Sequence, residues 1–338
     1  MTSLRGIFML AIFLHHIQLY TGAGNMSVTF FFVLSGFSLT LGYCNKIWDN
    51  NFEYRRYISK RFARLYPIHW LTMIAILPLV LIQLPGNASA LELIPKFFFN
   101  VCLLQSLIPT DGYYFSFNWV SWYLCDILIM AVLFPFFFRI INRMRWQMIL
   151  VTLAVLIAMY LLFLTILPLN RYHALVYINP ITRMLDFIIG ICLGLFFIYW
   201  NGCERQNGKN VFVILGLFSF LITIFISFTD CSAPYNIAFH YWIPISLLIF
   251  SVSAVSRLGG AFLLNNRCML FLGNISLSFF MIHQLIIRYA QYLHNMLYQT
   301  NDISSPIWIT MIFFIVIMIS YCSNKYFEKP VVKWLIKK

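Results

Sequence analysis

The stretch QMILVTLAVLIAMYLLFLTIL, from Gln147 to Leu167, runs for 21 residues without a charged side chain, a glycine or a proline. About 20 predominantly apolar residues are needed for an α-helix to cross the hydrocarbon core of a bilayer. The length and composition of this segment therefore predict a membrane-spanning helix.

Segments of the same kind recur along the whole chain, and they predict an all-α bundle with about ten spanning helices. The expected spans are Leu4–Tyr20, Ser27–Tyr43, Tyr66–Leu84, Phe117–Arg139, Gln147–Leu167, Ile178–Trp200, Val211–Phe228, Phe239–Val255, Met269–Tyr289 and Pro306–Tyr326. Leu91–Leu107 is a shorter apolar segment, either interfacial, re-entrant or an additional span. Because no repeat or long linker divides the chain, residues 1–338 are expected to form one domain.

The overall composition supports lipid as the solvent. Of 338 residues, 10% are charged and 62% are hydrophobic, and the mean hydropathy is +0.83. A soluble domain would be roughly a quarter charged, and its surface could not hide so much apolar area from water.

The net charge of +13 comes from short basic clusters between the apolar segments. Such clusters indicate membrane topology and lipid contact rather than nucleic acid, which would favour one continuous basic stripe. With the amino terminus in the cytoplasm, 19 of the 23 Lys and Arg residues fall in inner segments, and only Lys96, Arg171 and Arg288 in outer ones. This distribution predicts that both termini are cytoplasmic.

Eight cysteines are present, but none forms a CxxC pair or a Cys/His spacing that suits a tetrahedral metal site. We therefore expect neither a disulfide framework nor a bound metal.

Arg5 and His16 are eleven residues apart, so both side chains lie on one face of a helix, separated by about 16 Å along its axis. This spacing would place Arg5 at the cytoplasmic entrance and His16 near the middle of the membrane. An ionisable group in the membrane normally lines a cavity or pairs with another. The alternative is that Arg5 is a topology anchor and His16 a packing residue.

Arg61 and Arg64 are one helical turn apart within a basic run. Guanidinium groups in this arrangement suit phosphate recognition, since each offers a planar fork to phosphate oxygens. Binding of anionic lipid would explain the same charges.

Other polar residues within the expected spans have several possible roles. Arg183 and Asp186 could neutralise one another, and His283 could orient a neighbouring helix or act as a second acid or base. The group Trp119, Trp122 and Asp126 could bind a sugar by stacking and hydrogen bonding, although interfacial aromatic belts explain the tryptophans equally well.

Ser35 and Gly36 are the small residues of an aromatic stretch, FFFVLSGF, from Phe30 to Phe37. They form either a helix-packing point or the wall of a tunnel for a slender ligand. Ser35 is not expected to be a nucleophile, because it lacks the glycine pattern of a nucleophile elbow.

Seven short motifs follow one another along the whole chain. They are LRGIFMLAIFLHH from Leu4, FFVLSGF from Phe31, RFARLYP from Arg61, SWYLCD from Ser121, RMLDFIIGICLG from Arg183, LGNISLSFFMIHQ ending at Gln284, and YFEKP from Tyr326. Together they resemble the membrane-bound acyltransferase 3 family, which includes O-acetylases of surface polysaccharides. Many members have Glu where this chain has Asp126.

The resemblance implies an enzyme of the cytoplasmic membrane. Acetyl-CoA, or a related acyl-CoA, would be the donor, and a hydroxyl of a saccharide or lipid-linked glycan the acceptor. Arg61 and Arg64, with the wall formed by Ser35 and Gly36, would bind the donor, and His16 with Arg5 would form the catalytic group. Trp119, Trp122, Asp126, Arg183, Asp186 and His283 are the candidate acceptor contacts.

Two other classes of function remain open from the residues alone. A transporter or flippase for a lipid-linked saccharide would use buried charges to mark a translocation path. A membrane assembly protein would use its basic loops only to bind lipid headgroups. Neither would transfer an acyl group.

Overall fold

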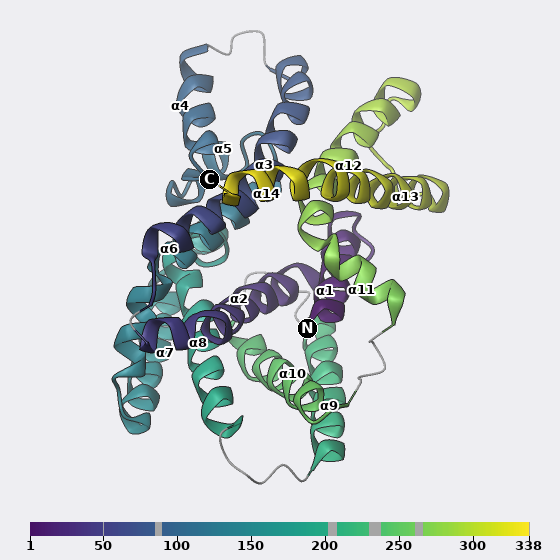
Figure 1. Ribbon diagram of the computed structural model, residues 1–338. Coiled ribbons are helices and arrows are strands. Elements are labelled where there is room, and N and C mark those ends of the chain that lie inside the picture. The colour runs from purple at the N-terminus through teal and green to yellow at the C-terminus, as the bar shows by residue number, and fades with distance from the viewer. Residues whose placement is uncertain (50, 85–89, 202–207, 230–237, 261–265, 338) are drawn as a thin grey trace.

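The computed structural model describes residues 1–49, 51–84, 90–201, 208–229, 238–260 and 266–337, and every regular element in these ranges is helical (Figure 1). The longer helices are α1 (Thr2–His16), α2 (Ala23–Trp48), α3 (Tyr54–Ile82), α4 (Ala90–Val101), α6 (Trp122–Asn142), α7 (Trp146–Ile166), α8 (Pro180–Asn201), α9 (Lys209–Thr229), α10 (Phe239–Arg257), α11 (Arg267–Asn274), α12 (Ser276–Tyr298), α13 (Pro306–Cys322) and α14 (Lys329–Lys337). The short elements are α5 (Asp111–Tyr114), the 3₁₀ turns η1 (Gln105–Leu107), η2 (Trp119–Ser121) and η3 (Leu169–Arg171), and the π-helical turns η4 (His173–Ile178) and η5 (Ser323–Glu328). The expected all-α class is confirmed.

Eight of the described helices are long and apolar enough to cross a bilayer, and the number becomes nine if α11 and α12 form one span. The expected number of about ten is therefore not confirmed within the described residues. The difference comes from α1, whose 15 residues extend only about 22 Å, less than the hydrocarbon thickness of about 30 Å. The predicted span reached Tyr20, but the helix ends at His16, and Gln18 just beyond it adopts a left-handed conformation with φ of 61°.

The expected span Met269–Tyr289 is broken. Its two parts, α11 and α12, meet at an angle of 69°. Gly273 lies at this junction, where an added Cβ would sit 1.9 Å from the carbonyl oxygen of Thr2. Only glycine permits the start of α1 to approach so closely, and the bend directs α12 past the end of α1.

Leu91–Leu107 is not an additional span. Its helical part, α4, has 12 residues and is followed by Leu103 in a left-handed conformation and by the turn η1. A helix of about 18 Å cannot cross the hydrocarbon core. It lies beside the last part of α3 in Figure 1.

The most extensive helix contact in the described chain joins α2 to α8, which meet through glycines. A Cβ on Gly36 would lie 2.2 Å from the carbonyl oxygen of Phe187, and one on Gly190 would lie 2.1 Å from that of Val33. Backbones in such contact gain dispersion energy and interhelical hydrogen bonding in the absence of a hydrophobic driving force. Gly36 is thus a helix-packing point, the first of the two roles considered for it.

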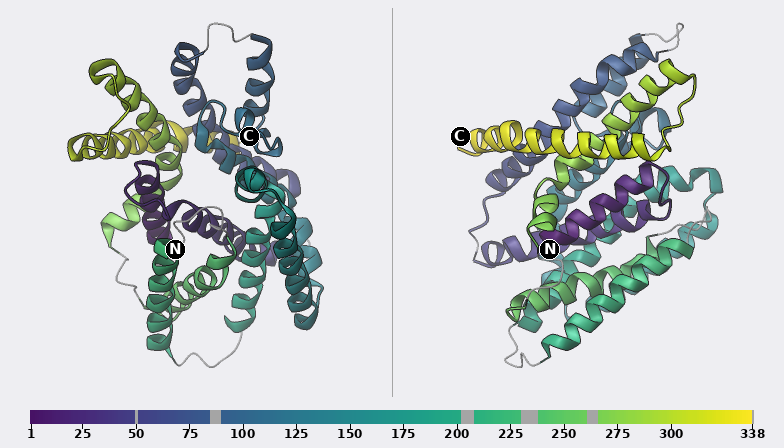
Figure 2. Two further views of the ribbon diagram at one scale, coloured as in Figure 1. Left: turned by 180° about the vertical axis from the view of Figure 1, so that it is seen from behind. Right: turned by 90° about the vertical axis from the view of Figure 1, so that its right-hand side faces the viewer.

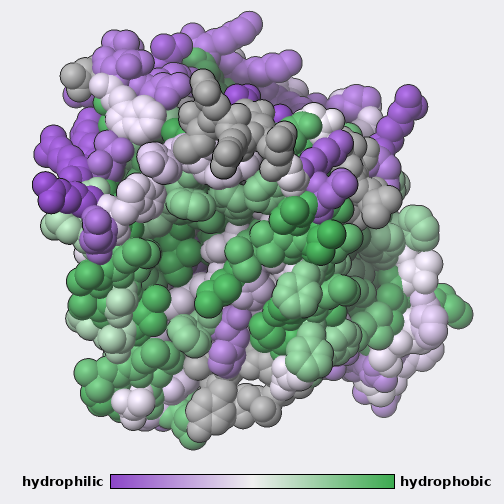
Figure 3. Space-filling view, turned by 90° about the horizontal axis from the view of Figure 1, so that it is seen from below, coloured by the Kyte–Doolittle hydropathy of each residue, from purple (hydrophilic) through white to green (hydrophobic). Residues whose placement is uncertain are grey.

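The outside of the bundle is apolar over a broad area. Figure 3 shows one such face, which is green across its centre and purple toward its edges. On α9 the exposed side chains include Ile214, Phe218, Leu221 and Phe225, each at least 60% exposed. Large exposed apolar areas of this kind face lipid. The chain is a multi-pass membrane protein.

The right-hand view of Figure 2 places the C-terminus and the connection between α2 and α3 toward the same end of the helices. This is the arrangement that a cytoplasmic C-terminus requires, because the basic α2–α3 connection is expected inside. The cytoplasmic location of the two termini stays a prediction.

Replacing Gly190 with Ala should destabilise the protein, because a methyl group cannot fit against the Val33 carbonyl without separating α2 from α8. We expect a loss of about 1–3 kcal/mol, measured as a lower midpoint of thermal unfolding in detergent. Gly42→Ala is the matched control. Nothing lies within 4 Å of that position, so helix propensity should make the change neutral or stabilising by up to about 1 kcal/mol. Equal midpoints for the two variants would contradict the packing role.

Candidate active site

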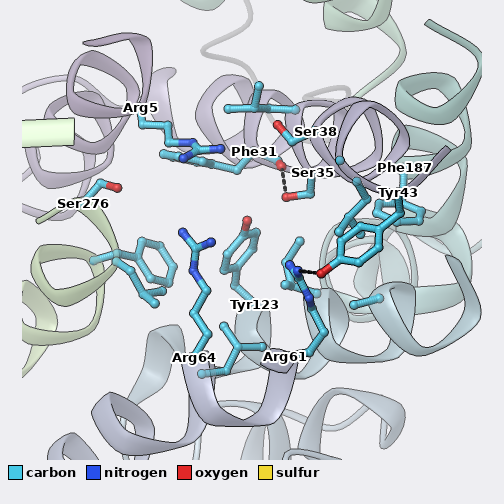
Figure 4. A pocket seen from close by; sticks show the side chains of 18 residues that line it. Arg5, Phe31, Ser35, Ser38, Tyr43, Arg61, Arg64, Tyr123, Phe187 and Ser276 are labelled. Atoms are coloured by element: carbon cyan, nitrogen blue, oxygen red, sulfur yellow. Dashed lines mark hydrogen bonds between the residues drawn. The ribbon is translucent and has the colours of Figure 1, made fainter. Parts of the chain in front are cut away.

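A cavity of about 340 Å³ lies between α1, α2, α3, α6, α8 and the start of α12. Figure 4 shows the three guanidinium groups of Arg5, Arg61 and Arg64 directed toward this space, together with the hydroxyl of Tyr123. None of the 18 lining residues is acidic. The cavity is therefore a strongly positive site with an otherwise largely apolar wall.

Arg61 is the most fixed of the three cations. Its Nη2 donates a hydrogen bond of 2.8 Å to the Tyr43 hydroxyl, and its guanidinium carbon lies 5.4 and 5.2 Å from the ring centres of Tyr43 and Tyr57. These cation–π contacts hold the charge without neutralising it.

Arg5 and Arg64 make no ion pair with any described residue, since the pair Arg183–Asp186 is the one found there. The Glu328 carboxylate forms no ion pair with Arg64 and instead accepts a hydrogen bond of 3.0 Å from Ser323. Three guanidinium groups without an acidic partner are arranged to accept an anion supplied from outside.

Ser35 and Gly36 face different surroundings in the structure. Ser35 lines the cavity and donates a hydrogen bond of 2.7 Å to the carbonyl oxygen of Phe31. Gly36 is not among the lining residues, because it faces α8. Ser35 thus contributes to the wall of the cavity, and Gly36 fixes the position of that wall by packing.

His16 and His283 are in contact, although 267 positions separate them in the sequence. The Nδ1 atom of His16 lies 3.2 Å from Nε2 of His283 and 3.0 Å from the carbonyl oxygen of Ile12. Nδ1 of His283 lies 3.2 Å from the carbonyl oxygen of Phe279. His283 is fully buried, so the pair is held within the helix bundle by α1 and α12.

These contacts assign the hydrogens of the neutral pair. Nδ1 of His283 faces a carbonyl oxygen and must donate, so its Nε2 is an acceptor. Nδ1 of His16 then faces two acceptors and must carry the proton of that ring. The remaining nitrogen of His16, Nε2, is unprotonated and forms no hydrogen bond within the described part of the chain. It is therefore available as a base or nucleophile.

The cavity does not reach His16, which is not among its lining residues. Phe280 connects the two sites. Its side chain lines the cavity, and its ring centre lies 5.8 Å from that of His283 and 5.1 Å from that of Tyr123. A slender chain extending from the arginines toward the histidines must pass this aromatic partition.

Arg183 and Asp186 form a buried ion pair with an N–O distance of 3.1 Å, as their spacing suggested. Arg183 also donates to the Asn25 side chain at 2.8 Å and to the Tyr177 carbonyl at 2.8 Å, and Trp242 donates to Asp186. These contacts tie α8 to α2, η4 and α10. Neither charged residue is among those that line the arginine cavity, and their role as acceptor contacts stays a prediction.

Of the three residues considered for sugar binding, one is exposed and two are buried. Trp119 is 43% exposed and lines a second pocket, near the end of α3. Trp122 is buried, and Asp126 is fully buried with one carboxylate oxygen accepting a hydrogen bond of 2.6 Å from Ser106. Asp126 and Trp122 are not among the residues lining the described pockets, and their contact with an acceptor stays a prediction.

Several site residues gave no recognisable signal in the sequence. Tyr43, Tyr123 and Phe280 are ordinary aromatic residues of apolar segments, and only the crossing of α2, α6 and α12 brings them to one cavity. The partnership of His16 with His283 likewise depends on the bend between α11 and α12. Sequence spacing cannot reveal contacts between helices this far apart.

The apolar helices, the cationic cavity and the adjacent histidine pair define a multi-pass membrane protein with a candidate active site inside the bundle. The sequence model of a family described as an acyltransferase domain matches residues 1–325. The chain therefore belongs to this family, the acyltransferase 3 family that its motifs resemble, and it is a membrane acyltransferase.

Two curated relatives agree with this assignment. Acyltransferase MdmB of Streptomyces mycarofaciens is 27% identical over 290 residues, which covers 80% of this chain and 70% of the relative. A putative acetyltransferase, ORF330 of Acidianus two-tailed virus, is 24% identical over 243 residues, or 70% of this chain and 67% of the relative. No solved structure matches the chain significantly.

Asp186→Asn should lower the thermal unfolding midpoint strongly, because it leaves the buried Arg183 cation without its counter-charge. Removing one partner of a buried pair costs about 3–5 kcal/mol. Arg171→Gln, an exposed charge change on η3, is the control and should leave the midpoint within experimental error. A normal midpoint for Asp186→Asn together with lost activity would instead assign the pair to substrate binding.

Proposed function

We propose that the protein transfers an acyl group, most simply acetyl, from cytoplasmic acyl-CoA to a hydroxyl of a saccharide or lipid-linked glycan of the cell envelope. It would act in the cytoplasmic membrane. The observation that carries the donor assignment is the cavity in which Arg5, Arg61 and Arg64 converge with no acidic neighbour in its lining. The acceptor class rests on the family resemblance and on the exposed aromatic surface at Trp119.

The chemistry of CoA matches the cavity. Its phosphates would be bound by the guanidinium forks, which are held in place by α1, α3 and the rings of Tyr43 and Tyr57. Its pantetheine arm is slender and largely uncharged, and would extend along the apolar wall formed by Phe31, Ser35 and Phe280. The thioester would then be directed toward His16.

At His16, the unprotonated Nε2 can remove the proton from the attacking hydroxyl. The hydroxyl oxygen forms a bond to the thioester carbonyl carbon, the C–S bond breaks, and the thiolate takes the proton from the imidazolium and leaves as CoA thiol. Alternatively, Nε2 attacks the carbonyl carbon itself, the C–S bond breaks and CoA leaves as its thiolate. The hydroxyl oxygen then takes the acyl group from the acyl-imidazole, the C–N bond breaks, and the hydroxyl proton goes to the thiolate. Both routes use the same nitrogen, and His283 keeps it free by accepting from Nδ1.

Replacing His16 with Ala should abolish acyl transfer while the protein still inserts and folds.

Replacing His283 with Phe should lower kcat by at least about tenfold, because His16 loses the acceptor that fixes its tautomer. CoA affinity should stay unchanged in both variants. Transfer is measured as label from radioactive acetyl-CoA recovered in the glycan fraction of membranes, and undiminished labelling by His16→Ala would refute both routes.

Replacing Arg61 or Arg64 with Gln should weaken CoA binding, measured by calorimetry on the purified protein, by at least about tenfold. A charge-assisted hydrogen bond contributes about 1.5–3 kcal/mol, which corresponds to this change or more. Arg56→Gln is the matched control, since Arg56 is an exposed residue of the same basic run that does not line the cavity. Equal affinities for all three variants would show that the arginines serve topology or lipid binding instead.

A flippase for a lipid-linked saccharide is the main alternative. It would move a glycan lipid across the bilayer without acyl-CoA, and no acylated product would form. Membranes that contain the protein and candidate glycans, incubated with radioactive acetyl-CoA, separate the two functions. Label retained in a glycan supports the acyltransferase, and transport of a glycan lipid in the absence of acyl-CoA supports the flippase.

A further inference from the structure

A second pocket, of about 230 Å³, lies at the opposite end of α3 from the arginine cavity. Gln83, at the end of α3, lines this pocket, whereas Arg64 of the same helix lines the cavity. Nineteen residues of helix correspond to about 28 Å, nearly the thickness of the hydrocarbon core. The two openings thus lie near opposite faces of the membrane.

The histidine pair lies between these two sites along α12. Ser276 and Phe280 line the cavity, His283 contacts His16, and Arg288 lines the second pocket. From His283, Arg288 is five residues further along the helix, or about 7.5 Å along the axis. The Asn118 side chain donates a hydrogen bond of 2.9 Å to the Met281 carbonyl, which fixes the loop carrying Trp119 against this part of α12.

The second pocket contains two cations, Lys96 and Arg288. They are two of the three basic residues that the topology assigns to outer segments. Arg288 donates to the Phe117 carbonyl at 2.6 Å and to the Gln83 side chain at 3.3 Å, and its guanidinium lies 4.7 Å from the Trp119 ring. All of these partners are neutral, so they orient the charge without compensating it.

Acidic side chains near this pocket do not neutralise it. Glu92 is one turn before Lys96 on α4, but the two do not form an ion pair. Asp111 accepts a hydrogen bond from the Tyr114 hydroxyl and is not among the lining residues. Within the described residues the pocket therefore offers two uncompensated positive charges beside an exposed indole ring.

Such a combination selects a particular ligand chemistry. The indole face of Trp119 provides a flat apolar surface of the kind on which a sugar ring stacks. The fixed guanidinium of Arg288 and the ammonium of Lys96 suit a phosphate or carboxylate carried by the same molecule. A neutral sugar would leave both charges without a partner.

We propose that this pocket binds the acceptor, and that the acceptor is a saccharide bearing an anionic group, either a phosphate or a carboxylate. The proposal rests on the acyltransferase function proposed above. The ring would stack on Trp119 and the anion would contact Arg288 and Lys96, so that a hydroxyl is directed along α12 toward the histidine pair. Donor and acceptor would thus approach that pair from opposite membrane faces.

Protection of Lys96 from chemical modification tests this assignment without requiring turnover. The full chain in phosphatidylcholine nanodiscs is treated with an amine-reactive, membrane-impermeant acetylating reagent, and modification of Lys96 is followed by mass spectrometry. Glucose 1-phosphate should slow the reaction at least about fivefold, whereas methyl glucoside at the same concentration should not. Lys325, which is exposed and outside the pocket, reports the general reactivity.

Variants of the arginines separate the pocket from general charge. Arg288→Gln should raise the glucose 1-phosphate concentration needed for protection by at least about tenfold, and Arg288→Lys should restore part of the loss. Arg171→Gln removes the third outer cation, which lies outside the pocket, and should have no effect. Calorimetric affinity for CoA should be unchanged in all three variants, which excludes global misfolding.

Three results would overturn the proposal. Absence of protection by glucose 1-phosphate would show that the pocket does not bind an anionic sugar. Protection by phosphatidylglycerol in the nanodisc, but not by the sugar phosphate, would identify an ordinary lipid-headgroup site. Protection of Lys96 without any acetyl-CoA-dependent labelling of glycans would refute the proposed transfer from acyl-CoA to a glycan, and with it the acceptor role. Labelling without protection would refute the acceptor pocket alone.

Discussion

A charged side chain inside a membrane protein needs an opposite charge or hydrogen-bond partners. In this structure some buried arginines have an acidic partner and others do not. Arg183 has an acidic partner and hydrogen-bond acceptors from α2, α8 and η4. It therefore contributes to the frame. The arginines of the cavity have no acidic partner in the described chain and open onto a space of about 340 Å³. The paired charge of Arg183 connects neighbouring helices, and the unpaired charges of the cavity arginines mark where an anionic ligand can bind.

The glycine contact between α2 and α8 places Arg183 among its partners and keeps it apart from the cavity arginines. Because Gly36 and Gly190 let the two backbones touch, Arg183 on α8 reaches Asn25 on α2. The same contact fixes the face of α2 that carries Ser35 and Tyr43 toward the cavity. In a membrane, where apolar association provides little energy, close backbone packing and buried polar contacts perform the task that a hydrophobic core performs in water.

The sequence predicted those features that depend on local composition. Apolar length predicted the helices, and charge spacing predicted that Arg183 would pair with Asp186 and that Arg61 and Arg64 would share a face. It overestimated α1, because hydropathy does not detect the left-handed turn at Gln18. It underestimated α3. The expected span began at Tyr66, where the apolar segment begins, but the helix begins at Tyr54 and includes the basic residues before Tyr66.

Features that depend on contacts between distant helices could not be predicted. Nothing in the neighbourhood of His283 indicates that its Nε2 will face His16, and nothing near Arg288 indicates that it will lie against Trp119. Both contacts follow from the course of α12 after its bend at Ile275. Arg288 was counted only as an outer topology residue, since charge counting cannot distinguish a cation exposed to solvent from one that lines a pocket.

The central claim is that the donor is bound by the arginine cavity with its thioester directed toward His16. A cryo-electron microscopy map of the protein with a non-hydrolysable acetyl-CoA analogue tests it most directly. The account predicts phosphate density between Arg5, Arg61 and Arg64, and pantetheine density that passes Phe280 and ends at Nε2 of His16. Phosphate density at any other place, or a thioester position remote from both histidines, would contradict it.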